Sequence, residues 1–246
     1  MKSVLIVGCG VVGSNLYSEL SKLNPSVYDK YKHFSIGEQR DKYDFCFICV
    51  DTPYADKDNV CDISQVKVAL QENNADIYII KSTVLPNTTN ELIKEFNKHI
   101  VFSPEFYGGT QHCNNFDFNF TILGGKKEDC IKVQQLLQDV YDARHSFRIV
   151  DSRLAELCKY MDNSWLATKV SFCCQFYDAC EKIGVDYEDL RELFILDPRV
   201  NPAQTYIYEE HPYWDSHCLN KDVSAISQYL DLDLLKYIIE FNNKRK

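Results

Sequence analysis

The sequence predicts an α/β fold class, with a doubly wound parallel sheet followed by an all-helical domain that contains one long helix. Two observations predict it. Over the first 150 residues short apolar runs alternate with helical patterns, which is typical of a sheet built from βαβ units. Beyond Asp151 this alternation stops, and residues 153–182 contain neither Gly nor Pro. We therefore expect a sheet domain over residues 1–150 and a helical domain over residues 151–246.

Each strand is expected where a short apolar run lies between polar or glycine-containing segments. The expected strands cover residues 2–7, 26–29, 45–50, 77–81, 100–102, 120–123 and 147–150. Helices are expected near residues 12–22, 62–72, 88–97 and 127–140, with Asp62 and Thr88 as N-caps. The long helix should end before Gly184, since glycine often follows a helix C-terminus. Further helices should begin at Asp186 and Asp222, and a last one should cover residues 232–242.

Composition limits the classes of partner. The chain has 246 residues, 45% of them hydrophobic, and a net charge of −9; this charge disfavours nucleic acid, because phosphate backbones are bound by basic surfaces. The longest apolar runs are strand-sized, so we expect no membrane association, no signal peptide and a cytoplasmic location. The eleven cysteines lie mostly in apolar patterns without paired C-x-x-C units. We therefore expect reduced, mostly buried thiols and no metal site.

The stretch VLIVGCGVVGSNL contains a candidate cofactor motif. Gly8, Gly10 and Gly13 have the G-x-G-x-x-G spacing between an apolar strand and a helix. In a Rossmann-type sheet these glycines allow a tight turn, the approach of a pyrophosphate to the backbone, and close packing of helix on strand. Asp29 ends the next strand, where its carboxylate would bind the adenosine ribose and repel a 2′-phosphate. The motif therefore predicts NAD rather than NADP, against the alternative of a glycine turn without a ligand.

Polar residues follow three later strands. Thr52 lies in VDTP, Thr83 in KSTV and Glu105 in SPEF, at strand ends where open parallel sheets bind ligands. Either threonine, taken singly, is explained as well by the capping of a turn. A lone carboxylate such as Glu105 is more often a surface residue than a catalytic one.

Two further groups of polar residues lie in the helical domain. On the long helix Glu156, Lys159 and Asn163 share one face at i, i+3 and i+7 spacing, which suits a solvated stripe as well as the border of a cleft. In SHCLNKD, Cys218 lies three positions before Lys221, whose positive charge favours a thiolate. Most cysteines of this chain are expected to be inert core residues. From these residues by themselves, Cys218 can be either a nucleophile or an inert packing residue.

Taken together and in order, seven motifs resemble the UDP-glucose/GDP-mannose dehydrogenase family over nearly the whole chain. They are GCGVVG, VDTP, KSTV-x-P, SPEF, AELCKYMDN, IGVDYEDL and CLNKD. The resemblance implies an NAD-binding domain followed by a central domain whose long helix forms a homodimer. It also implies NAD-dependent oxidation of a nucleotide-sugar primary alcohol to the acid. In that reaction a cysteine captures the sugar aldehyde as a thiohemiacetal, and water later releases the acid from a thioester.

The resemblance assigns roles to individual positions of this chain. Catalytic roles are implied for Thr83, Glu105, Lys159, Asn163, Cys218 and Asp222. Cofactor contacts are implied for Gly8, Gly10, Val11, Val12, Gly13, Asp29, Thr52, Pro53, Ser82 and Thr83. Substrate contacts are implied for Glu105, Phe106, Lys159, Asn163, Arg199 and Lys221, with Arg199 at the place of the arginine that the family supplies from the dimer partner. On this resemblance Cys218 is the nucleophile.

Two features depart from the family pattern. The family precedes its cysteine with a glycine-rich loop, whereas this chain reads EEHPYWDSHC, and we expect Tyr213 and Trp214 to fill the space or redirect the backbone. A third, nucleotide-binding domain is not expected, because the sequence ends at FNNKRK. Two alternatives therefore remain beside a nucleotide-sugar dehydrogenase. One is a hydroxyacid dehydrogenase of the related two-domain superfamily, and the other is a catalytically silent NAD-binding partner of a full-length enzyme.

Overall fold

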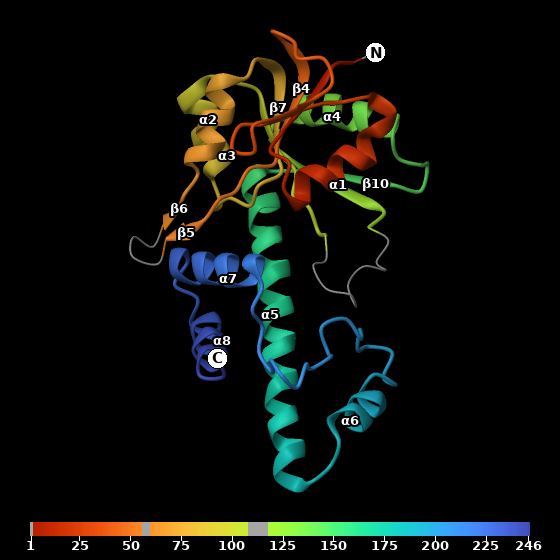
Figure 1. Ribbon diagram of the computed structural model, residues 1–246, viewed down its shortest axis with the longest axis vertical. Coiled ribbons are helices and arrows are strands. Elements are labelled where there is room, and N and C mark those ends of the chain that lie inside the picture. Colours follow the sequence, from red (N-terminus) through yellow and green to blue (C-terminus); the bar gives the residue numbers. More distant parts are fainter. Residues whose placement is uncertain (1, 56–59, 108–117) are drawn as a thin grey trace. The chain divides into compact units, whose positions relative to one another are not determined.

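The computed structural model describes residues 2–55, 60–107 and 118–246 (Figure 1). The chain divides into two compact units, one from Met1–Phe106 with Asp117–Lys159 and the other from Tyr107–Phe116 with Tyr160–Lys246. The first unit contains the sheet, and the described part of the second is built from helices and the segments that join them.

Among the described residues of the first unit, eight strands form one sheet in the order β10-β9-β8-β7-β4-β1-β2-β3. Their bounds are Val4–Val7 for β1, Ser26–Asp29 for β2, Phe34–Ile36 for β3, Tyr43–Ile48 for β4, Ala75–Ile80 for β7, Ile100–Phe102 for β8, Phe120–Gly124 for β9 and Ser146–Val150 for β10. A separate hairpin pairs β5 (Tyr54–Ala55) with β6 (Val60–Cys61). All seven predicted strands are present, and the predicted fold class is confirmed.

The sheet is mixed rather than wholly parallel. β1, β2, β4, β7 and β8 run parallel, whereas β3 is antiparallel to β2 and β9 is antiparallel to β8. The sequence does not predict β3, because this short edge strand leaves Phe34 and Ser35 exposed and so has no apolar run. The carboxyl ends of the five parallel strands meet at one edge of the sheet, which is where such sheets bind ligands.

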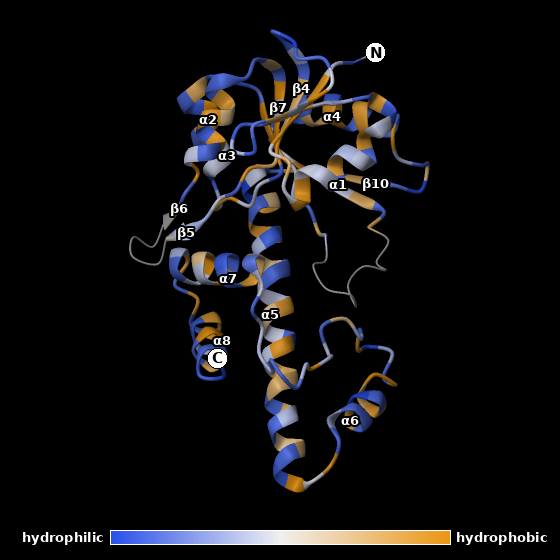
Figure 2. Cartoon of the chain, in the orientation of Figure 1, coloured by the Kyte–Doolittle hydropathy of each residue, from blue (hydrophilic) through white to orange (hydrophobic). Residues whose placement is uncertain are grey.

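Helices cover both faces of the sheet (Figure 1). α1 (Val11–Glu19) and α4 (Lys127–Gln138) bury Leu16 and Val133 on one face, and α2 (Ser64–Glu72) and α3 (Thr88–Phe96) bury Leu70 and Leu92 on the other. The 3-10 helix η1 (Leu20–Leu23) continues α1. The central strands, which helices cover on both faces, are largely apolar (Figure 2). This burial is why the strands can be predicted as continuous apolar runs.

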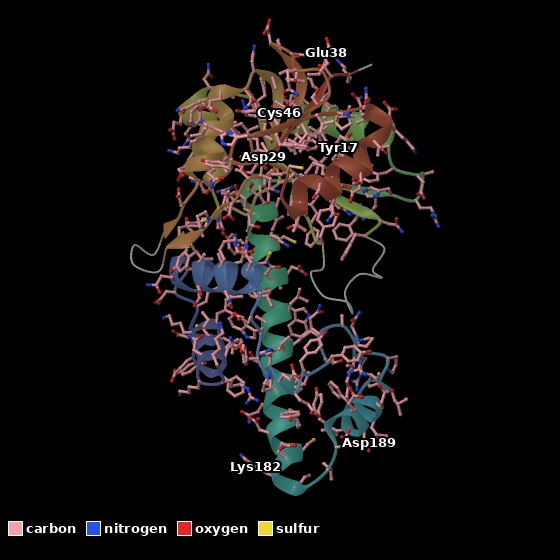
Figure 3. All side chains as sticks on the ribbon, viewed as in Figure 1. Tyr17, Asp29, Glu38, Cys46, Lys182 and Asp189 are labelled. Atoms are coloured by element: carbon pink, nitrogen blue, oxygen red, sulfur yellow. The ribbon has the colours of Figure 1, made fainter. Side chains whose placement is uncertain are left out.

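The described helices of the second unit follow the prediction at most of their ends. They are α5 (Ser152–Ile183), whose residues from Tyr160 onward belong to this unit, and α6 (Tyr187–Phe194), α7 (His217–Tyr229) and α8 (Asp233–Asn243). α5 carries Lys182 in its last turn (Figure 3) and is followed by Gly184 at φ +73°. The Asp186 side chain caps α6 by accepting from Asp189 N at 3.0 Å. No helix in the described ranges combines the length and apolar character needed to cross a bilayer.

The predicted start of α7 at Asp222 is wrong. The helix begins at His217, because the Ser216 side chain caps it by accepting from Leu219 N at 3.1 Å. Serine is among the strongest N-cap residues, and its hydroxyl satisfies a first-turn N–H that has no partner within the helix. As a consequence, Cys218 lies in the first turn of a helix.

The predicted N-cap Thr88 is also wrong, because the N-cap position of α3 is Asn87. The cap is the carboxylate of Glu156 on α5, which accepts from Asn87 N at 2.6 Å and from Thr89 N at 2.8 Å. Glu156 is fully buried, and burial raises its pKa above the ordinary value despite these donors. The residue that shares a face with Lys159 in the sequence is therefore a structural cap. The predicted cap Asp62 is likewise outside the N-cap position, which Ile63 occupies, although its carboxylate accepts from Ser64 N.

Replacing Glu156 with alanine should lower the free energy of unfolding by about 2 kcal/mol, because the N–H groups of Asn87 and Thr89 at the start of α3 lose their acceptor. Denaturant unfolding of both proteins measures this difference. Glu181→Ala provides the matched control, since Glu181 is an exposed residue of the same helix. Equal losses in the two variants would contradict the capping role.

Candidate functional site

The glycine loop after β1 has the geometry that its sequence predicts. Gly8 has φ +92°, a left-handed conformation that favours glycine. A Cβ added at Gly13 would lie 1.9 Å from the Gly8 carbonyl oxygen, so only glycine allows this approach of helix to loop. A Cβ at Gly10 would meet no atom within 4 Å. A ligand can therefore approach the backbone of Gly10 closely.

The start of α1 suits an anionic group. Gly10 occupies the N-cap position of α1, no described side chain caps the helix, and Val11 is exposed while Val12 is partly buried. The N–H groups of an uncapped helix start attract anions, and a pyrophosphate is such an anion. The residues present therefore fit the predicted dinucleotide.

Asp29 lies at the end of β2 (Figure 3). Its side chain lines a cleft that the glycine loop helps to form. The cleft has a volume of about 260 Å³, and Gly8, Gly10, Asp29 and Lys32 are among its lining residues. The Asp29 carboxylate accepts from Cys9 N at 2.8 Å, Lys32 N at 3.0 Å and Tyr31 N at 3.1 Å. Burial would raise the pKa of Asp29, but these backbone donors lower it overall. The carboxylate is therefore ionised at neutral pH and holds the loop as well as lining the cleft.

We expect NAD to bind more tightly than NADP by about 1–3 kcal/mol, because the ionised Asp29 repels a 2′-phosphate in a partly buried site. Calorimetric titration of the protein with each cofactor measures the difference. In Asp29→Asn the repulsion is removed, so the preference should shrink. Equal affinities of the unaltered protein for the two cofactors would contradict this role.

The turns that follow β4 and β7 are tied to each other. The Thr52 hydroxyl donates to the Thr83 carbonyl oxygen at 2.7 Å, and the Ser82 hydroxyl donates to the Val50 carbonyl oxygen at 2.6 Å. Thr52, Ser82 and Thr83 are buried, whereas Pro53 is exposed. The hydroxyls of Thr52 and Ser82 therefore hold the two turns together, which is the structural explanation that the sequence left open for Thr52.

A charged cluster follows β8 in the first unit. Lys159 Nζ lies 3.7 Å from Glu105 Oε1, and the two side chains are only 6% and 11% exposed. The same ammonium lies 5.2 Å from the centre of the Phe106 ring, a distance that allows a cation–π interaction. The structure thus brings Glu105, Phe106 and Lys159 together, as the resemblance implies.

Lys81 belongs to this cluster, although the sequence marks it only as the end of a strand. Its ammonium donates to the Pro104 carbonyl oxygen at 3.3 Å and to Ser103 Oγ at 3.4 Å. Burial lowers the pKa of Lys81, and Glu105 and Lys159 are close enough to interact with it electrostatically. A lysine that ends an otherwise apolar strand just before STV is the sequence signal for this role.

A second cluster lies in the second unit, around a buried carboxylate. Asp222 is 1% exposed, and it accepts from Asn163 Nδ2 at 2.6 Å and from Lys221 Nζ at 2.5 Å. Asn163 lies four residues after Lys159 on α5, so the two side chains leave the helix on the same face. Three of the residues implied by the resemblance are therefore hydrogen-bonded to one another here.

The structure places Cys218 and Arg199 differently from the members of these clusters. Cys218 is the exposed cysteine among the ten that the structure describes, seven of which are buried, and the expected reduced, mostly buried thiols are thereby confirmed for these ten. Arg199 is 88% exposed and binds Asp197 of its own turn, with Nη2–Oδ2 at 2.6 Å. The contacts given for Arg199 in the described second unit are with Asp197, and none of them is with Asn163 or Asp222.

Two family models match this chain. Residues 28–145 match the NAD binding domain of the UDP-glucose/GDP-mannose dehydrogenase family, and residues 153–244 match the central domain of the same family. The first match confirms NAD as the cofactor.

Individual proteins give the same result. The chain is 29% identical to a UDP-glucose 6-dehydrogenase of Rickettsia bellii over 263 residues, covering 93% of this chain and 60% of that protein. It therefore spans less than two thirds of this relative's length. A solved UDP-glucose dehydrogenase structure from Pyrobaculum islandicum superimposes with a TM-score of 0.82 at 22% identity, over 99% of this chain and 68% of the other.

A structure from outside the dehydrogenases of nucleotide sugars shares the fold. The 3-hydroxyisobutyrate dehydrogenase of Mycobacterium tuberculosis superimposes with a TM-score of 0.70 at 12% identity, over 99% of this chain and 93% of that one. At this identity the likeness concerns the fold alone. The matched ranges contain six of the seven motifs described above in the same order, all except GCGVVG at residues 8–13, and the chain belongs to the UDP-glucose/GDP-mannose dehydrogenase family.

Proposed function

We propose that this chain carries out the NAD-dependent oxidation of a primary alcohol of a nucleotide sugar to the acid. One observation carries the proposal. α5 presents a lysine and an asparagine one turn apart, and each is paired with a carboxylate of its own unit, Lys159 with the largely buried Glu105 and Asn163 with the buried Asp222. Cations and amide donors held in this way stabilise negative charge on a reacting oxygen, which develops when an alcohol is oxidised.

Bound NAD supplies the hydride acceptor, one molecule for each of two oxidations. Lys159 stabilises the negative charge that develops on the sugar oxygen as its proton leaves. Glu105 of the first unit and Asp222 of the second are the groups that transfer protons, and Thr83 is the group that positions water. Lys81 binds the Ser103–Pro104 turn and so keeps Glu105 in place beside Lys159.

Cys218 is the proposed nucleophile of the second stage. Its sulfur bonds to the carbon of the aldehyde, and the aldehyde oxygen takes up a proton to give a thiohemiacetal. Loss of a hydride from that carbon, together with the hydroxyl proton, leaves a thioester. Water then adds to the thioester carbon, the carbon–sulfur bond breaks, and the acid and the thiol are released. The position of Cys218 in the first turn of α7 supports this role, because a helix start favours the thiolate.

The test is turnover with UDP-glucose, UDP-N-acetyl sugars and GDP-mannose, with the NADH formed per sugar counted. Formation of about two NADH per sugar is expected for oxidation to the acid through a covalent cysteine intermediate. One NADH, formed instead with a small hydroxy acid, would favour the alternative that the shared fold of 3-hydroxyisobutyrate dehydrogenase suggests. NAD binding without turnover on any of these substrates would favour the silent partner.

We also propose that the chain forms a homodimer through α5. Trp165, Phe172 and Phe176 lie on one face of the helix and are 59%, 51% and 45% exposed. Apolar patches of this kind on a protein surface mark contact surfaces, and identical chains most often pair by a twofold axis.

Cytoplasmic location remains an expectation from the sequence.

Light scattering at micromolar concentration should therefore give the mass of a dimer. The double variant Trp165→Glu, Phe172→Glu should give the mass of a monomer, because two buried carboxylates would be left without partners in the interface. Circular dichroism of the variant establishes that its helices are retained. A monomeric mass for the unaltered protein would contradict the proposal.

A further inference from the structure

The segment that replaces the family's glycine-rich loop is anchored inside the second unit. Trp214 is 4% exposed, and its indole Nε1 donates to Ser171 Oγ on α5 at 3.0 Å. Tyr213 and Trp214 were expected to fill the space of the family's glycine-rich loop or to redirect the backbone, and the structure shows that the Trp214 side chain is buried against α5. The indole lies in a packed interior, so a large side chain here fixes the segment in place, whereas glycines leave a loop to be held by its ligand.

The backbone of Trp214 is held on both sides by one side chain. Asn242, at the end of α8, accepts from Trp214 N at 2.9 Å and donates through Nδ2 to the Trp214 carbonyl oxygen at 2.9 Å. Asn242 is 1% exposed, so solvent cannot replace these bonds if the side chain is removed. A buried amide that satisfies both a donor and an acceptor of one residue sets the position of that residue closely.

The residues that follow α8 hold the segment around Trp214 as well. Arg245 Nε donates to the Pro212 carbonyl oxygen at 2.6 Å, and its guanidinium also binds Asp178 of α5. Lys246 Nζ lies 2.9 Å from Asp215. Pro212 and Asp215, which flank Trp214 in the sequence, are therefore bound to the residues that directly follow α8.

This anchored segment leads directly into the helix that carries Cys218. Asp215 accepts from Asn220 Nδ2 at 2.6 Å, and Ser216 provides the N-cap of α7. Cys218 follows two residues later, in the first turn. The N–H groups of that turn carry the partial positive charge of the helix, which favours a thiolate only as long as the turn stays intact.

We propose that Asn242 is a positioning residue for Cys218: by holding the Trp214 peptide it sets where α7 begins and so the reactivity of the thiol. The importance of that reactivity for catalysis rests on the proposed function, but the reactivity itself can be measured without turnover.

The test is the rate of alkylation of Cys218 by iodoacetamide as a function of pH, followed by mass spectrometry of the Cys218 peptide. In Asn242→Ala the rate at pH 7 should fall about two- to fivefold, and the midpoint of the rate profile should rise by about 0.3–0.7 pH unit. Asn243→Ala is the matched control, because Asn243 is the adjacent, exposed residue of the same type. Its profile should equal that of the unaltered protein.

The buried thiols report on folding in the same experiment. Cys174 and Cys180 are buried in α5, so they should stay unalkylated if Asn242→Ala is folded. A merely structural role of Asn242 would lower the melting temperature without moving the Cys218 midpoint, and that result in a folded variant overturns the proposal.

Ser171→Ala is the second variant, since it removes only the acceptor of the Trp214 indole. It should shift the midpoint in the same direction by a smaller amount. If Asn242→Ala fails to fold, an unchanged profile in Ser171→Ala overturns the proposal. Absence of turnover in the unaltered protein would contradict the proposed function. It would not affect the test of Asn242, because the alkylation of Cys218 is measured without turnover.

Discussion

Serine in place of Cys218 should halt the reaction after the first oxidation, so that the NADH formed per nucleotide sugar falls from two to one. The reason is that an alcohol is a far weaker nucleophile than a thiolate near neutral pH. Without capture of the aldehyde carbon, no hydride can leave for the second oxidation. The affinity for NAD should stay unchanged, because Cys218 belongs to the second unit and the glycine loop to the first.

Rapid-quench analysis of the products, together with calorimetric titration with NAD, measures both quantities. Cys158→Ser is a suitable control, since Cys158 is a partly buried thiol of α5 to which no catalytic role is given. Formation of the acid at an unchanged rate by Cys218→Ser would rule out the thiol as nucleophile. If the unaltered protein binds NAD but turns over no nucleotide sugar, the variant will behave identically to it, and the silent-partner alternative holds.

Removal of the Lys159 side chain should slow both oxidations by about 10²–10³, the usual effect of losing one group that stabilises a developing negative charge. Lys159 differs from Cys218 in this respect, because negative charge develops on the sugar oxygen in each stage. Its side chain is only 6% exposed, so water screens its charge little. Lys159→Ala also removes the ammonium group that lies 3.7 Å from Glu105 Oε1.

Single-turnover rates of NADH formation separate the two stages in Lys159→Ala. Lys182→Ala tests for an unspecific effect of charge removal, since Lys182 lies in the exposed last turn of the same helix. Loss of only the second oxidation in Lys159→Ala would assign this lysine to the thioester stage. That result would contradict the proposed role of Lys159 in both oxidations. A melting temperature close to that of the unaltered protein shows that the effect concerns catalysis.

The sequence alone was sufficient for the cofactor loop and for seven of the eight strands described in the main sheet. Strands buried on both faces, such as β1, are nearly continuous apolar runs. The less buried strands β9 and β10 still carry enough apolar residues between polar segments to be located in the sequence. The spacing of Gly8, Gly10 and Gly13 follows from a local steric requirement, and such a requirement leaves the same trace in any chain that folds this way. Family resemblance then pointed to Lys159, Asn163 and Cys218 through motifs a few residues long.

Tertiary structure decided what each polar residue does. Glu156 and Lys159 share a helix face in the sequence, yet Glu156 caps α3 while Lys159 pairs with Glu105. The role of Asn242 leaves no local pattern, because its partner Trp214 is 28 residues away in the chain. Periodicity and motifs record contacts between neighbours along the chain, whereas a hydrogen bond between distant segments depends on how those segments pack, and this packing is decided only when the chain has folded.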